Sequence, residues 1–272
     1  MPLMAGAQAQ INTKKVKIAD FTEKITKVVL TGNDFYDGCL KDEIASRWRV
    51  SPYEFCSLEE FETLKTDENY YFLITTEGQF KREKEPGLKF LSLVKGGAKA
   101  SKGLNSMLEV VSMPLASAED PSGRELVLFP AFIDIIQKYA LDSTEKDLNA
   151  YTGLANYTLN LAKSGGMKIM FAECDLSSQI TGEYIETTFD EGMVITDEDS
   201  SDSMVAKNTE NTLISYVVAP SDPAPGSYCY KMLIDSQKYE LYYFRKHRIS
   251  KTSGAGFLEE DIKRIVTNRM FN

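Results

Sequence analysis

Blocks of apolar and polar residues alternate over residues 27–76 and predict a regular succession of strands and helices. Residues 27–31 are mostly apolar and β-branched and end at Gly32-Asn33, a pattern typical of a buried strand followed by a turn. From Asp34 to Trp48, the larger apolar residues fall on one stripe of a helix and the charged residues lie outside it. The segment is therefore predicted to be an amphipathic helix that Asp34 caps.

A second strand, a second helix and a third strand follow. Residues 49–56 are extended and contain Pro52, which removes a ladder donor and favours the edge or the start of a strand. An S-x-x-E capping box begins a helix over residues 58–65, and the aromatic run 70–74 returns as a strand. This order of elements predicts an α/β (or α+β) fold in which helices cover a sheet.

The middle of the chain changes from strands to helices. Further strands are predicted over residues 87–94 and 108–113, the second of which ends at Pro114. Helical periodicity then extends over residues 126–141 and 143–163. These two helices are predicted to form a hairpin that covers one face of the sheet.

The same order of elements recurs after residue 167. A strand begins at Lys168, a short strand covers residues 193–196, and a third strand begins at Thr212. The last strand of each half follows a similar turn, Asp67-Glu68-Asn69 in one and Thr209-Glu210-Asn211 in the other. This self-similarity favours two duplicated β-α-β-α-β units that form a mixed sheet with helices packed on it.

An aromatic β-hairpin and a helix close the chain. Residues 228–234 and 238–245 are predicted to pair through the turn Asp235-Ser236-Gln237, and a helix covers residues 257–269. The predicted division is residues 1–10 as a signal-peptide remnant or disordered tail, 11–125 as the first α/β unit, 126–166 as the helical hairpin, and 167–272 as the second α/β unit with its C-terminal hairpin and helix. All of these can form one compact domain.

Composition and charge limit the class of protein. The chain has 272 residues, of which 43% are hydrophobic and 11% aromatic, which suffices for a packed core. The net charge is -9, and residues 173–210 alone contain eleven acidic residues against one basic residue. Such an acidic protein is a poor candidate for binding nucleic acid. No run approaches the roughly 18 to 20 apolar residues of a membrane-spanning helix, so no transmembrane segment is predicted.

The first ten residues suggest export. Ala7-Gln8-Ala9 is an A-x-A pattern that follows small and apolar residues, as at the cleavage site of a secretory signal peptide. The alternative is a plain tail rich in alanine and glutamine. The pattern favours a periplasmic or secreted protein.

No metal site or cofactor is predicted. Four cysteines lie far apart, without the spacing of a zinc site, and buried thiols are expected, with one disulfide compatible with export. They are Cys39, Cys56, Cys174 and Cys229. The acidic run over residues 197–202 lacks the glycine and glutamate of an EF-hand loop and is predicted to be a solvated acidic loop or a helix start.

Two segments carry a resemblance to known proteins. Residues 51–62 (SPYEFCSLEEFE) and 229–244 (CYKMLIDSQKYELYYF) resemble segments of uncharacterised exported proteins of Gram-negative gut and oral bacteria. The resemblance covers only part of the chain, and its motifs concern packing. It implies a location in the cell envelope and no activity or functional residue.

Two functions follow from these patterns. The first is a non-enzymatic exported cell-envelope protein that binds a protein partner or ligand, favoured by the export pattern, the aromatic hairpin and the lack of paired catalytic groups. The second is a small-ligand or nucleotide-type binding protein, or an enzyme, whose site lies where the strands ending at Thr31 and Ala172 meet at a switch point.

Four residues are the candidates for that ligand site. Gly32, Asn33, Asp34 and Asp175 would gather at the two strand ends. The two aspartates are equally natural as helix caps.

Overall fold

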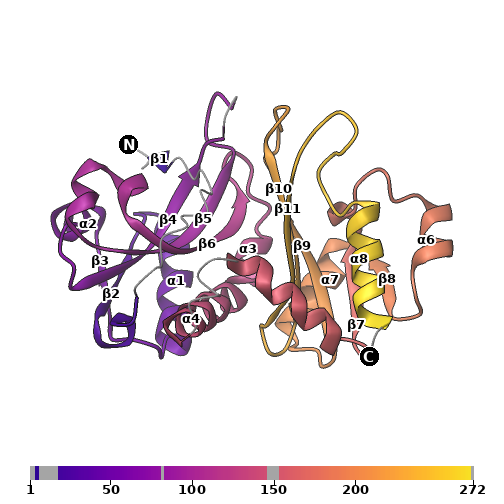
Figure 1. Ribbon diagram of the computed structural model, residues 1–272, viewed down its shortest axis with the longest axis horizontal. Coiled ribbons are helices and arrows are strands. Elements are labelled where there is room, and N and C mark those ends of the chain that lie inside the picture. Colours follow the sequence, from indigo (N-terminus) through magenta and orange to yellow (C-terminus); the bar gives the residue numbers. More distant parts are fainter. Residues whose placement is uncertain (1–3, 6–17, 81–82, 146–152, 271–272) are drawn as a thin grey trace.

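The computed structural model describes residues 4–5, 18–80, 83–145 and 153–270, which form two α/β units side by side (Figure 1). The first unit contains a sheet with the strand order β3-β2-β4-β5-β6. Its strands are β2 (Ile25–Val29), β3 (Tyr53–Cys56), β4 (Tyr70–Gly78), β5 (Leu88–Lys95) and β6 (Leu108–Ser117). Strands β2, β3 and β4 are parallel, whereas β5 and β6 continue antiparallel. The short strand β1 (Met4–Ala5) pairs in parallel with the end of β4.

The second sheet repeats this topology. Its order is β11-β10-β9-β7-β8, with β7 parallel to β8 and β9, and with β10 and β11 continuing antiparallel. Its strands are β7 (Lys168–Ala172), β8 (Met193–Thr196), β9 (Thr212–Val218), β10 (Tyr228–Asp235) and β11 (Leu241–Arg248). The α/β fold and the duplication of the units are confirmed, and each unit forms its own mixed sheet.

The elements outside the sheets are α-helices and 3-10 helices. The α-helices are α1 (Asp34–Arg47), α2 (Leu58–Leu64), α3 (Arg124–Val127), α4 (Phe129–Glu145), α6 (Gly182–Thr188), α7 (Glu198–Ala206) and α8 (Glu259–Met270). The 3-10 helices are η1 (Phe21–Glu23), η2 (Ala98–Lys102), η3 (Leu104–Ser106), η4 (Gly153–Lys163) and η5 (Glu173–Asp175). None of the helices in the described ranges has the length and apolar character needed to cross a bilayer.

The layer formed by α1 and α4 lies between the two sheets (Figure 1). One apolar cluster joins Ile44 of α1 and Phe132 of α4 to both Leu73 of β4 and Ile214 of β9. The ring of Phe132 lies 5.7 Å from that of Tyr216 in β9, whose hydroxyl donates to the carbonyl of Leu115 in β6. Burial of this shared layer therefore holds the two units together.

Equivalent faces of the two sheets have different neighbours. In the first unit, α2 covers the face that carries Phe72 and Ile74. The corresponding face of the second sheet carries Ile214 and Tyr216 and packs, with α7, against the shared layer. The opposite face of the second sheet is covered by α8, whose Ile262 lies in a separate apolar cluster.

Several predicted boundaries are corrected. Strand β6 continues through Pro114 to Ser117. Proline is tolerated here because β6 is an edge strand and because its register with β5 shifts between Lys89 and Phe90, next to Pro114. The same reasoning correctly placed Pro52 next to an edge strand, β3. The second helix of the predicted hairpin is a 3-10 helix that begins at Gly153, and residues 146–152 lie outside the described ranges, as do 1–3 and 6–17 of the predicted tail and its continuation.

All four cysteines are free thiols. Cys56 and Cys229 are buried, as predicted, and burial raises the pKa of each thiol to about 11. Cys39 is half-buried and Cys174 is exposed, so the prediction of a buried thiol is wrong for Cys174. Cys174 lies in η5, directly after the carboxyl end of β7.

A buried ion pair joins α8 to the second sheet. The ammonium group of Lys231 in β10 bonds Asp261 in α8, and both side chains are fully buried. The same carboxylate accepts hydrogen bonds from Tyr243 (2.6 Å), Arg245 (3.1 Å) and the backbone N–H of Leu258 (2.8 Å). Burial opposes ionisation of Asp261, but Lys231 and the other donors outweigh it and hold its pKa below the usual range.

We expect Asp261→Asn to lower the free energy of unfolding at pH 7 by about 3–5 kcal/mol, because it leaves the charge of Lys231 buried without a partner. The stabilisation by Asp261 is complete above its unfolded pKa of about 3.9 and is lost as the pH falls toward the folded pKa. Urea unfolding from pH 7 to pH 3 should therefore show the difference between wild type and variant shrinking. The exposed pair of Glu259 with Lys263 provides the control, since Glu259→Gln should cost about 0.5 kcal/mol or less. Equal losses in the two variants would contradict a special role for Asp261.

Candidate functional site

A pocket opens where β2 and β4 separate. Their parallel pairing ends at Val28 and Leu73. The chain leaves β2 through α1 to reach β3 on one side, whereas β4 lies on the other side, so the strand order reverses here. Ligands of open α/β sheets bind in the crevice at such a switch point, outside the carboxyl ends of the strands.

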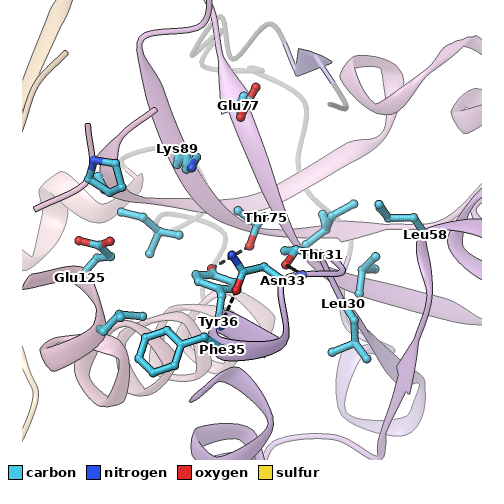
Figure 2. A pocket seen from close by; sticks show the side chains of 16 residues that line it. Leu30, Thr31, Asn33, Phe35, Tyr36, Leu58, Thr75, Glu77, Lys89 and Glu125 are labelled. Carbon is cyan, nitrogen blue, oxygen red and sulfur yellow. Dashed lines mark hydrogen bonds between the residues drawn. The ribbon is translucent and has the colours of Figure 1, made fainter. Parts of the chain in front are cut away.

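The pocket has a volume of about 590 Å³, a size that suits a small organic ligand. Its walls come from strands β2, β4, β5 and β6, the starts of α1 and α2, and α3 (Figure 2). The lining residues are Val29, Leu30, Thr31, Asn33, Phe35, Tyr36, Leu58, Ile74, Thr75, Glu77, Lys89, Leu115, Ala116, Pro121, Glu125 and Leu126. Nine of these sixteen side chains are apolar, and seven carry a polar group.

The turn between β2 and α1 satisfies its own backbone donors. The carboxylate of Asp37 accepts hydrogen bonds from the N–H groups of Thr31 and Gly32, each at 2.8 Å, and from the Thr31 hydroxyl. Gly32 has a φ of 86°, in the left-handed region that favours glycine. Asn33, not Asp34, caps α1, because its side chain accepts from the N–H of Tyr36. An incoming anion would therefore find these donors already bonded to a carboxylate.

Two aromatic residues at the start of α1 shape the pocket. The Tyr36 hydroxyl forms a hydrogen bond of 2.8 Å with the Thr75 hydroxyl (Figure 2). The ring of Tyr36 packs edge-on against that of Phe129. Burial raises the pKa of Tyr36 well above its usual value, so the hydroxyl stays protonated. Phe35 is 70% exposed, although it lines the same pocket, and Leu58 is 37% exposed. The pocket thus has an apolar rim that faces water.

Three charged residues line the pocket. Glu77 and Lys89 are directly opposite each other on the antiparallel strands β4 and β5. Glu125 belongs to α3, the short helix between the units, and is only 8% exposed. Its carboxylate accepts a hydrogen bond of 2.9 Å from the N–H of Gly123. Among the described residues, no base forms an ion pair with Glu125.

The equivalent crevice of the second unit is filled. The pairing of β7 with β9 ends at Met170 and Ile214. Beyond it, the Asp175 carboxylate accepts hydrogen bonds from the Ser215 hydroxyl (2.6 Å) and the N–H of Val217 (3.1 Å). The side chain of Asp175 therefore fills the space between the ends of β7 and β9, whereas the corresponding space in the first unit is open.

Arg124 of α3 completes this filling. Its guanidinium bonds Asp175 (3.1 Å), Asp202 (3.0 Å) and the carbonyl of Ser215 (3.2 Å), and it lies over the ring of Tyr216. Burial and the charges of these carboxylates oppose each other, and the carboxylates prevail in raising the pKa of Arg124. Arg124 is 4% exposed, so these bonds are made in a region from which water is excluded.

The four predicted site residues occupy different places. Asn33 lines the pocket, and Gly32 and Asp34 belong to the same turn without lining it. Asp175 lies in the second unit, where it binds Arg124, because the strands ending at Thr31 and Ala172 belong to different sheets.

Other contributors were missed by sequence reasoning. Phe35 was assigned to the apolar packing stripe of its helix, whereas it is 70% exposed at the pocket. Tyr36 was not singled out, and Glu125 comes from a segment far along the chain. Of the two alternatives predicted for the acidic run over residues 197–202, the structure shows the helix start, with Asp197 as the cap of α7. The pairing of Asp202 with Arg124 had no signal in the sequence.

The described residues contain no group of three or more His, Cys, Asp or Glu side chains placed to hold a metal ion. Comparisons with protein-family models, curated proteins and solved structures found no match to this chain.

We expect Arg124→Met to lower the free energy of unfolding by about 3–5 kcal/mol, because it leaves the buried carboxylates of Asp175 and Asp202 without a counter-charge. Arg124→Lys should cost less, since it retains the charge but loses the forked donors. Arg248 is exposed, and Arg248→Met should change stability by about 0.5 kcal/mol or less. Chemical denaturation of the three variants measures this order. A loss for Arg124→Met as small as for Arg248→Met would show that the network contributes little.

Proposed function

We propose that this protein is a non-enzymatic binding protein that takes a small amphipathic ligand in the pocket at the carboxyl ends of β2 and β4. The observation that carries the proposal is the contrast between the two units. The same crevice is filled by Asp175 and Arg124 in the second unit and is open in the first. The two units share one topology, and only the first leaves the crevice at the strand ends open. An external ligand can bind in this open crevice.

The lining favours an apolar ligand body with a few polar groups. Leu115, Leu126 and Ile74 supply apolar surface, and Phe35 adds an exposed ring at the rim. The hydroxyl groups of Tyr36 and Thr75 can orient polar atoms of a ligand. Apolar walls with polar groups at defined places are typical of ligand pockets.

A nucleotide is a poor fit to the same pocket. Phosphate groups bind at free backbone N–H groups at a strand end and helix start. Here the N–H groups of Thr31 and Gly32 are bonded to Asp37, which brings a negative charge to that place. We therefore favour a ligand without a phosphate over the nucleotide alternative.

A binding role also agrees with the side chains in the pocket better than catalysis does. No His, Cys or Ser is among its lining residues within the described ranges. The Thr75 hydroxyl is bonded to a Tyr hydroxyl that stays protonated, and not to a base.

We expect Phe35→Ala to weaken binding of the neutral apolar probe N-phenyl-1-naphthylamine by roughly fivefold or more, because a ring that contacts the ligand is removed. Phe55 is the matched control: it is 36% exposed and does not line the pocket, so Phe55→Ala should change the dissociation constant less than about twofold. Fluorescence titration provides the constants. Absence of saturable probe binding to the wild type, or equal effects of the two substitutions, would reject this pocket as the site.

We further propose that the protein acts outside the cytoplasm, in the periplasm or as a secreted protein, and that its ligand or protein partner is found in the cell envelope. The support is the Ala7-Gln8-Ala9 pattern. Cleavage after Ala9 would also remove β1, which contributes only the pairs of Met4 and Ala5 to the sheet.

N-terminal sequencing of the protein from fractionated cells that express its native gene tests the location. We expect the exported form to begin at Gln10. Recovery of the protein from the cytoplasmic fraction with residues 1–9 attached would contradict export.

A further inference from the structure

The charge inside the pocket is unbalanced. Glu77 and Lys89 are directly opposite on β4 and β5, a placement in which their opposite charges offset each other. Glu125 is the third charged residue in the lining, and no described base is paired with it. The lining therefore has one carboxylate in excess, and it belongs to Glu125, a residue that is only 8% exposed.

We infer that the ligand carries a positively charged amine and that Glu125 binds this group. This inference rests on the proposed binding function of the pocket. A carboxylate in a largely apolar cavity is costly unless it is hydrogen-bonded and paired with a cation. The N–H of Gly123 supplies one hydrogen bond to Oε2, and an ammonium group would supply the missing charge.

The position of Glu125 in the pocket is held by the anchoring of the neighbouring residue, Arg124. Arg124 is held in the second unit by Asp175 and Asp202, so the backbone of α3 cannot easily withdraw. Figure 2 shows Glu125 on the side of the pocket away from Leu58, with Thr75 and Tyr36 between them in the view. A ligand that reaches from the apolar rim at Leu58 to Glu125 would cross the pocket.

The remaining walls suit the same chemistry. Phe35 and Tyr36 line the pocket, and aromatic rings attract cations through their π faces. Asp37 fills the backbone donor site at the end of β2, so the pocket offers little to an anionic group except Lys89, which lies opposite Glu77. An amine on an apolar body of one or two rings matches this distribution.

Three compounds that share one apolar body test the inference: 2-naphthylmethylamine, which is cationic at pH 7, 2-naphthalenemethanol, which is neutral, and 2-naphthoate, which is anionic. Isothermal titration of the full chain measures their dissociation constants. We expect the wild type to bind the amine about tenfold or more tightly than the alcohol, and the naphthoate most weakly.

Glu125→Gln keeps the shape of the side chain and removes its charge. We expect the variant to bind the amine and the alcohol within about threefold of each other, with affinity for the alcohol unchanged. Asp120→Asn is the control: Asp120 is exposed and does not line the pocket, so the preference of the wild type should persist.

The outcomes separate the two proposals. If the wild type binds the alcohol or the naphthoate as tightly as the amine, the assignment of a cationic ligand is overturned and the binding function stands. If the preference for the amine survives in Glu125→Gln, Glu125 is not its recognition group. If the wild type binds none of the three, the proposed binding function falls together with the inference.

Discussion

The position of α3 between the two units depends on the bonds that the buried guanidinium of Arg124 forms. Arg124 lies in the connection between the two units and bonds Asp175, Asp202 and the Ser215 carbonyl in the second. Because a buried charge is tolerated only with partners, these bonds specify where α3 must lie. Once α3 is held there, Glu125 is brought to the pocket of the first unit.

One topology thus leads to two different crevices. Both sheets have the same strand order and directions, and in both the parallel pairing ends after a few residues. In the second unit Asp175 bonds Ser215 and Val217 across the gap, whereas in the first unit Asp37 turns back to bond the N–H groups of Thr31 and Gly32. The gap in the first unit stays open because the carboxylate of Asp37 bonds the N–H groups of its own turn and does not reach across to the neighbouring strand.

The stacking of the two units is asymmetric, and burial explains why it is stable. Buried apolar residues of α1 and α4 belong to one cluster with residues of both sheets, so one helical layer supplies core to two units. Two polar side chains in these buried regions are paired: Tyr216 donates to the carbonyl of Leu115 in the other sheet, and Lys231 bonds Asp261 of α8. Such pairing removes most of the cost of placing these groups away from water.

The sequence by itself determined the class of fold, most strands and helices, and the repetition of the units, because hydrophobic periodicity and turn residues are local signals. It also pointed to the turn at Gly32-Asn33 as a strand end that could meet a ligand. Only the tertiary structure decided that Asp175 lies in a separate unit, that Asn33 caps α1, and that Glu125 joins the pocket. These depend on contacts between residues far apart in the chain, whose partners are chosen by packing and charge pairing and leave no periodic trace in the sequence.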